Sequence, residues 1–272
     1  MSIGEINTNS FNNIGGIAGK NLGEICFSKS EVTIIGDGIN VGGITGKSEN
    51  GKLFRCINYN KISGNKCVGG ICGSSKNTVF EECGNETNGI VESIVENSGG
   101  IVGYIEYGVD DLDYTVEKCY NYATVKSKTR IGGIVGSAWN TEGKSIVIRN
   151  CYNTGSIEGK EKYNGGILGG TYNLYDSTNT DKSKNIIDAC YNIGDIGPMF
   201  SNQISPKYAD VSDSFFLNKK SNFSGYGFGK EDIRFKTTDY FSIYYIFQNK
   251  YPDYWCINEN NNGYLSLMWQ NE

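Results

Sequence analysis

The residues best placed to do chemistry are three aspartates that stand close together, Asp110, Asp111 and Asp113. Neighbouring carboxylates can bind calcium or hydrolyse a glycosidic bond. The segment lacks the glycine and the distal glutamate of an EF-hand loop, and the spacing along the chain does not set the separation that catalytic carboxylates need. We therefore interpret these aspartates as candidate ligand-binding residues, with glycoside hydrolysis as the alternative.

Nine cysteines and no histidine occur among the 272 residues. The absence of imidazole excludes Ser-His-Asp and Cys-His nucleophiles, histidine zinc ligands and H-E-x-x-H helices. Cys67 and Cys72 form a C-x₄-C pair, but Cys72 occupies what the repeats indicate is an outward strand position. We expect no catalytic residues, no metal and no cofactor, and we interpret the cysteines as packing residues.

The composition narrows the class of protein further. The formal charge of −5 comes without a basic stripe, which argues against a nucleic-acid partner. No apolar run approaches the ~20 residues of a membrane helix, so we expect no membrane insertion. Glycine is abundant, at 37 residues against three prolines, and apolar residues alternate with polar ones, which indicates folded β structure.

A repeated motif, Gly-Gly-Ile-x-Gly, must position any site. Its Gly-Gly pairs begin at residues 15, 42, 69, 99, 132 and 165, so the repeats are 27 to 33 residues long. A motif at such a period indicates a solenoid or array, in which each unit buries its apolar face against its neighbours. Together with the landmarks below, each repeat is predicted to hold three short strands, giving an all-β chain of about six coils.

A second landmark, Cys-Tyr-Asn in its full form, follows the glycines. Its cysteines stand at Cys26, Cys56, Cys83, Cys119, Cys151 and Cys190. Because side chains alternate along a strand, inward isoleucines after Gly-Gly imply inward cysteine and asparagine, with Tyr120 pointing out. Coils stacked about 4.8 Å apart would place like residues over like. We expect columns of isoleucine, cysteine and asparagine, the asparagines bonding turn carbonyls and one another.

The repeats end near Pro198, so we divide the chain into repeats at 1–197 and a degenerate last coil with a C-terminal cap at 198–272. In this second part, Ser214 is predicted to take a cysteine position, and 231–250 has the pattern of one or two short amphipathic helices. The cap would cover the open apolar end of the array. The first residues resemble the tail of an earlier repeat, so we expect the chain to begin inside a longer array.

The connection between the Gly-Gly-Ile strand and the cysteine strand lengthens at 104–118, 137–150 and 170–189. Insertions on one face of a solenoid often mark its binding face. Aromatic rings beside hydrogen-bonding groups suit recognition of sugar or protein, unless the rings simply pack against the coil. The candidate ligand-binding residues are Tyr104, Tyr107, Asp110, Asp111, Asp113, Trp139, Tyr172, Tyr175 and Asp176.

The glycine motifs, the Cys-Tyr-Asn-x-Gly-x-Ile phase and the ending from Trp255 to Gln270 resemble the GLUG-repeat family. That family occurs in large bacterial surface proteins, including adhesins and non-catalytic regions of some IgA-cleaving metallopeptidases. The resemblance implies a right-handed parallel β-helix on a secreted or wall-attached protein of a Gram-positive bacterium. This sequence departs from the family at Leu265, where a proline is usual, and it lacks the zinc-peptidase signature of the larger relatives.

The sequence therefore predicts a non-catalytic, extracellular surface module for adhesion or ligand interaction. A host glycan or protein is the expected partner, and the chain is expected to be a monomeric segment of a longer one. The alternatives are a purely structural stalk, a carbohydrate-active β-helix enzyme and a phage tail-fibre segment.

Overall fold

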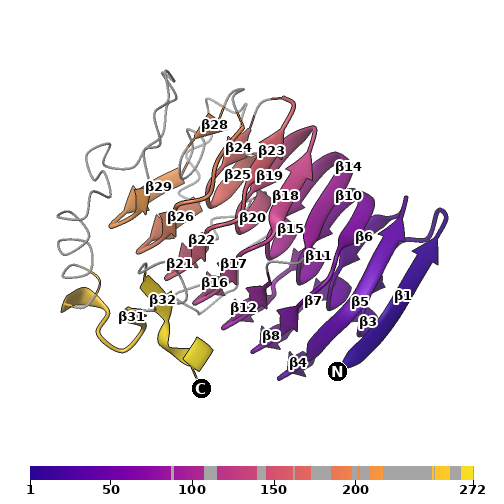
Figure 1. The fold of residues 1–272 in the computed structure, drawn as a ribbon, viewed down its shortest axis with the longest axis horizontal. Coiled ribbons are helices and arrows are strands. Elements are labelled where there is room, and N and C mark those ends of the chain that lie inside the picture. The colour runs from indigo at the N-terminus through magenta and orange to yellow at the C-terminus, as the bar shows by residue number, and fades with distance from the viewer. Residues whose placement is uncertain are drawn as a thin grey trace.

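The protein is an all-β parallel solenoid, seen in a computed structural model in which each coil of chain lies against the next (Figure 1). The described residues are 1–86, 89–106, 115–139, 145–161, 163–172, 185–197, 201–202, 209–216, 247, 249–257 and 265–271. No helix within these ranges has the length and apolar character to cross a membrane. The architecture agrees with the predicted right-handed parallel β-helix, since parallel crossover connections are almost always right-handed.

Three stacked sheets form the walls of the rod among the described residues. The first wall begins at the Gly-Gly-Ile corner and contains one strand from each of six coils. Its strands are β3 (Ala18–Asn21), β7 (Thr45–Glu49), β11 (Cys72–Lys76), β15 (Val102–Ile105), β20 (Val135–Ala138) and β25 (Leu168–Thr171). Six strands are separated by five steps, so the rod makes about five turns between its first and last strand here.

The second wall precedes the cysteine corner and continues one coil further, into the predicted degenerate coil. Its strands are β4 (Glu24–Cys26), β8 (Lys52–Phe54), β12 (Val79–Glu81), β16 (Val116–Glu117), β21 (Ile146–Arg149), β26 (Asn185–Asp188) and β29 (Ala209–Ser212).

The third wall is a large sheet that bends around the remainder of each coil. The tyrosine–asparagine strands are β9 (Ile57–Asn58), β13 (Gly84–Asn85), β17 (Tyr120–Asn121), β22 (Tyr152–Asn153), β27 (Tyr191–Asn192) and β30 (Phe215–Phe216). The strands after them are β1 (Ser2–Thr8), β5 (Lys29–Gly36), β10 (Ile62–Gly69), β14 (Ile90–Gly99), β18 (Thr124–Ser127) and β23 (Ile157–Gly159). Short strands before the glycines complete it: β2 (Ile14–Gly15), β6 (Ile39–Gly42), β19 (Thr129–Gly132), β24 (Asn164–Gly165) and β28 (Ser201–Asn202).

The register of these strands confirms the repeat read from the sequence. Gly42 pairs with Gly15 on one side and with Gly69 on the other. Strand β1 pairs with β5 from Ser2↔Ser30 onward, so the first residues do occupy the tail of a coil.

The predicted isoleucine column forms the centre of the core. Its members Ile44, Ile71, Ile101, Ile134 and Ile167 are all fully buried. Ile17, in the first coil, is 41% exposed because a neighbouring coil covers it on one side only.

A cysteine column runs beside the isoleucines, and it contains the predicted cysteines except Cys26. Cys56, Cys83, Cys119, Cys151 and Cys190 are buried in it, and all nine cysteines are free. The prediction for Cys26 was wrong by two residues, because Cys26 pairs with Phe54 and leaves Ser28 opposite Cys56. At the other end Ser214 takes the cysteine position as predicted, and its hydroxyl accepts a hydrogen bond from the Cys190 amide at 3.1 Å.

The asparagine column is a continuous ladder of side-chain amides, as predicted. Nδ2 donates to Oδ1 of the next coil at 2.9 Å from Asn58 to Asn85 and at 2.8 Å from Asn85 to Asn121. The ladder continues at 2.7 Å to Asn153 and at 2.8 Å to Asn192. The other Nδ2 hydrogen of Asn121 and of Asn153 reaches a turn carbonyl at 2.8 Å. Four buried amide oxygens, those of Asn85, Asn121, Asn153 and Asn192, thereby accept a hydrogen bond inside the rod.

The glycines make room for this ladder. A Cβ on Gly100 would lie 2.1 Å from the carbonyl oxygen of Gly133 and 2.4 Å from Cγ of Asn121. Such separations are far below van der Waals contact, so the second glycine of each pair is required for close approach.

One expectation about facing was wrong. Cys72 was expected to point outward, but it is fully buried and belongs to the same core as Ile71. The chain bends at this corner, and strict alternation of side chains does not continue through a bend. Tyr120 does project from the coil, yet it is only 2% exposed because C-terminal residues cover it.

The described C-terminal residues form an antiparallel pair, β31 (Trp255–Ile257) with β32 (Leu265–Leu267), followed by a 3₁₀ turn, η2 (Met268–Asn271). They lie along the tyrosine-bearing flank of the rod (Figure 1), in one apolar cluster with Tyr152 and Tyr191. A hydrogen bond of 2.8 Å from the Tyr251 amide to the Phe247 carbonyl closes one helical turn. Most of the predicted helical stretch at 231–250 lies outside the described residues.

Candidate functional site

The predicted binding face on the long corners can be assessed at three residues. Tyr104, Trp139 and Tyr172 are described, at the ends of β15, β20 and β25. The other six candidates lie outside the described residues: Tyr107, Asp110, Asp111, Asp113, Tyr175 and Asp176.

The structure brings Tyr104 and Tyr172 together. Their rings meet edge to face, with centroids 5.8 Å apart. The Arg130 guanidinium lies 4.3 Å from the centre of the Tyr172 ring, and the Tyr172 hydroxyl lies 3.2 Å from the Asn97 amide nitrogen. These contacts hold both half-buried rings against the rod. Burial also raises the pKa of Tyr172.

Trp139 lies on the same wall but is more open, with 40% of its surface exposed. Its amide donates to the Ile105 carbonyl at 2.7 Å, which fixes the backbone at the end of β20. The described corner residues thus combine packed rings with one exposed indole.

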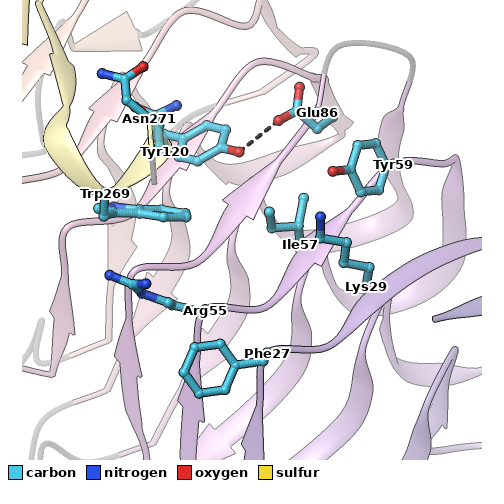
Figure 2. Close-up of a pocket in the computed structure, with 10 residues that line it drawn as sticks. Phe27, Lys29, Arg55, Ile57, Tyr59, Glu86, Tyr120, Trp269 and Asn271 are labelled. Carbon is cyan, nitrogen blue, oxygen red and sulfur yellow. Dashed lines mark hydrogen bonds between the residues drawn. The ribbon is translucent and has the colours of Figure 1, made fainter.

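A groove on the flank that carries the tyrosine–asparagine strands was not predicted from the sequence. It encloses about 450 Å³. Its lining residues are Phe27, Lys29, Arg55, Ile57, Tyr59, Glu86, Tyr120, Trp269, Gln270 and Asn271 (Figure 2). The first four coils supply one side of the groove, and the C-terminal turn η2 supplies the other.

The groove exists because the tyrosine column stops. In register, the column runs from Tyr152 and Tyr120 to Gly84, Ile57 and Lys29. Gly84 has no side chain, and the Tyr120 ring fills that space, since a Cβ on Gly84 would lie 2.2 Å from Cζ of Tyr120. Beyond this point the flank has no large ring of its own column to support the C-terminal segment.

Arg55 stands at the lower rim of the groove (Figure 2). Its Nε lies 2.6 Å from the Glu82 carboxylate, and its guanidinium lies 6.0 Å from the Phe27 ring centre and 5.5 Å from that of Phe54. Arg55 is therefore engaged by an ion pair and by two aromatic rings.

Trp269 forms the opposite wall. Its indole Nε1 donates to the Lys118 carbonyl at 2.9 Å, and its ring lies 5.5 Å from that of Tyr120. Gln270 beside it donates to the Tyr122 hydroxyl at 3.1 Å and accepts from the Tyr152 hydroxyl at 2.8 Å. The indole is therefore fixed in place with part of its surface toward the groove.

The remaining polar groups are less engaged. The Tyr120 hydroxyl donates to Oε1 of Glu86 at 2.7 Å, and burial followed by the Glu86 charge raises the pKa of Tyr120. Burial also raises the pKa of Tyr59, which faces the groove as a neutral phenol. Among the described residues, neither the Tyr59 hydroxyl nor the Lys29 ammonium has a polar partner. The groove thus offers aromatic faces, an apolar floor at Ile57 and unengaged polar groups.

The described part of the chain holds no cluster of three or more potential Cys, Asp or Glu metal ligands.

The groove joins residues from the first coils to the last turn, and no sequence spacing predicts that contact. One signal was available: the tyrosine of the Cys-Tyr-Asn landmark is replaced by glycine at Gly84 and by isoleucine at Ile57.

The fold defines a parallel β-solenoid protein. Residues 128–158 match the family model of the GLUG motif, and together with the β-solenoid this match supports the GLUG-repeat β-helix that the sequence predicted. A solved Bacteroides ovatus structure, provisionally named as an immunoglobulin A1 protease, is similar with a TM-score of 0.59 and 15% identity, over 90% of this chain and 86% of that one. At that identity the likeness shows the fold alone. A search of curated proteins found no match.

Proposed function

We propose that this chain is a non-catalytic ligand-interaction module of a bacterial surface protein, and that the flank groove is its binding site. The observation that carries the proposal is a groove with aromatic walls and unengaged polar groups on an otherwise regular rod. Small-molecule sites are concave, occupy ~300–1,000 Å³ and combine apolar lining with a few polar groups. A plain stalk has no need for such a groove.

A sugar is the ligand class that these walls suit best. Sugar rings present C–H faces to aromatic side chains and hydroxyls to polar ones, as Trp269 and Tyr59 allow. We therefore extend the proposal to adhesion through a host glycan, with the groove accepting a terminal or exposed sugar.

The absence of catalysis is part of the proposal. Glycoside hydrolysis ordinarily uses two carboxyl groups flanking the bond. Among the described lining residues Glu86 supplies the only carboxylate, and it accepts the Tyr120 hydroxyl. The neighbouring Glu82 is engaged by Arg55, which supports binding rather than bond cleavage.

An extracellular location fits the condition of the cysteines. Six of the nine thiols are buried in the rod, where burial raises the pKa of Cys72, Cys83 and Cys119. A buried, protonated thiol reacts slowly with oxidants because the thiolate is the reactive form. The module can therefore work outside the cell as a monomeric segment of a longer chain without disulfides.

A glycan array with the labelled protein tests this function. The Trp269→Ala variant should lose the glycan signals, whereas Trp139→Ala, which removes the exposed indole of the corner face, should keep them. Loss of signal only in Trp139→Ala would move the site to the corner loops. A wild-type protein with no glycan or host-protein ligand would favour the stalk.

A further inference from the structure

The charge pattern of the rod leaves Lys29 without an ion partner among the described residues. Cationic and acidic side chains pair between adjacent coils at the same register position. Lys66 with Glu96 at 3.3 Å and Lys126 with Glu158 at 2.9 Å are two such pairs. Lys29 instead stands opposite Ile57, and no ion pair in the described chain includes it.

The other groups of the groove are mostly engaged. Arg55 is paired with Glu82, and the Gln270 carboxamide bonds to Tyr122, Tyr152 and the Leu267 amide. The ammonium of Lys29 therefore remains available for a ligand.

Three lining residues are charged: Lys29, Arg55 and Glu86. Glu82 neutralises Arg55, and Glu86 accepts the Tyr120 hydroxyl, so Lys29 is the lining cation without an ion partner in the described chain. An ammonium in this position favours an anionic group of a ligand over a cationic one. A lysine ammonium is a compact point charge that suits a single carboxylate.

We propose that the groove binds an acidic saccharide, a sugar ring that carries a carboxylate, with the carboxylate on Lys29. This inference rests on the proposed sugar-binding function. The Tyr59 hydroxyl and the second Glu86 oxygen bond to sugar hydroxyls, and the Trp269 indole packs against the ring. Figure 2 shows Lys29 and Tyr59 together on one side of Ile57, with Trp269 and Tyr120 across from them.

The test measures binding by saturation-transfer NMR with glucuronic acid, galacturonic acid and N-acetylneuraminic acid, each beside its methyl ester. The ester keeps the ring and removes the charge. At least one acid should bind roughly tenfold more tightly than its ester, a typical effect for one charge-assisted contact. Lys29→Gln should reduce the affinity for that acid to that of the ester, whereas Lys29→Arg should largely retain it.

The matched control is Lys160→Gln, which removes an exposed lysine from a coil outside the groove and should leave binding unchanged. Equal binding of acid and ester that Trp269→Ala abolishes would overturn the acidic preference and leave the sugar-binding function intact. Failure of all three acids to bind would also overturn the inference, and an empty glycan array would then overturn the function as well.

Discussion

The side-chain amide of Asn121 donates to Asn153 in the next coil at 2.7 Å and accepts from Asn85 in the preceding one at 2.8 Å. A fully buried polar side chain is thereby satisfied on both sides without water. The same contact recurs between adjacent coils, so the ladder ties the stability of each coil to that of its neighbours.

Replacing Asn121 by alanine should destabilise the rod strongly. The change removes both ladder bonds and the bond to the Ala123 carbonyl, leaving buried donors and acceptors unpaired. We expect the free energy of unfolding to fall by ~3 kcal/mol, measured by urea denaturation. Asn7→Ala, at an exposed position, should change it by less than ~0.5 kcal/mol. Equal effects of the two variants would contradict a structural role for the ladder.

Replacing glycine by alanine should have very different effects on stability at a corner glycine and at a surface glycine. Gly100→Ala places a Cβ 2.1 Å from the Gly133 carbonyl oxygen, whereas a Cβ on Gly23 meets no atom within 4 Å. We expect Gly100→Ala to lower the midpoint of thermal unfolding sharply, by more than ~3 kcal/mol in free energy, or to prevent folding. Gly23→Ala should keep the wild-type midpoint, and a lowered one would contradict the stacking shown here.

Alkaline pH should weaken the fold through its buried thiols. Burial raises the pKa of Cys67 to about 11, and it raises the pKa of Cys72 above its ordinary value of 9.0. Below pH 9 both states keep these protons, so the stabilisation is complete. Above it the unfolded chain loses protons that the folded chain retains, and the free energy of unfolding falls as pH rises.

Urea titrations at pH 7, 8.5 and 10 measure this dependence. A Cys72→Ala variant lacks one of the responsible thiols and should show a shallower fall above pH 9, whatever its stability at pH 7. A free energy of unfolding that rises between pH 8.5 and pH 10 would show that the thiols do not control this range.

Trp255 should control whether the C-terminal residues stay on the flank. It is fully buried, lies 5.7 Å from the Tyr191 ring and donates to Asn150 at 3.3 Å. Trp255→Ala should cost ~3–5 kcal/mol of local stability, in the range for a large buried ring. Hydrogen exchange should then accelerate at Leu267, whose amide is bonded to Gln270, more than at Ile134 in the core. Equal acceleration at both would mean that the segment is not a separate unit.

Most of the coil architecture could be predicted because every coil must stack on its neighbours in the same register. Ile101, Gly100 and Asn121 occupy the same positions as their equivalents in other coils, so repetition alone places them in columns. Errors arose where a coil departs from the common register or turns a corner. Cys26 precedes its expected slot by two residues, and Cys72 lies just after a bend.

The groove could not be predicted in the same way. It depends on a contact between Trp269 and the flank at Tyr120, and nothing in the periodicity links the last turn of the chain to a coil far before it. From the repeat pattern alone, the tyrosine is predicted to be exposed, because the pattern does not show that C-terminal residues cover it. The absence of that tyrosine at Gly84 is visible in the sequence, but its meaning depends on where the C-terminal turn lies.

The asparagine ladder also has an electrical direction. Every link points its N–H from one coil toward the next along the chain, so the amide dipoles add rather than cancel. The starting oxygen, Oδ1 of Asn58, is buried and accepts no hydrogen bond from the described residues. The ladder is therefore polar along the axis of the rod, negative toward the first coils, and each further coil with an asparagine in this position lengthens the ladder dipole in the same sense.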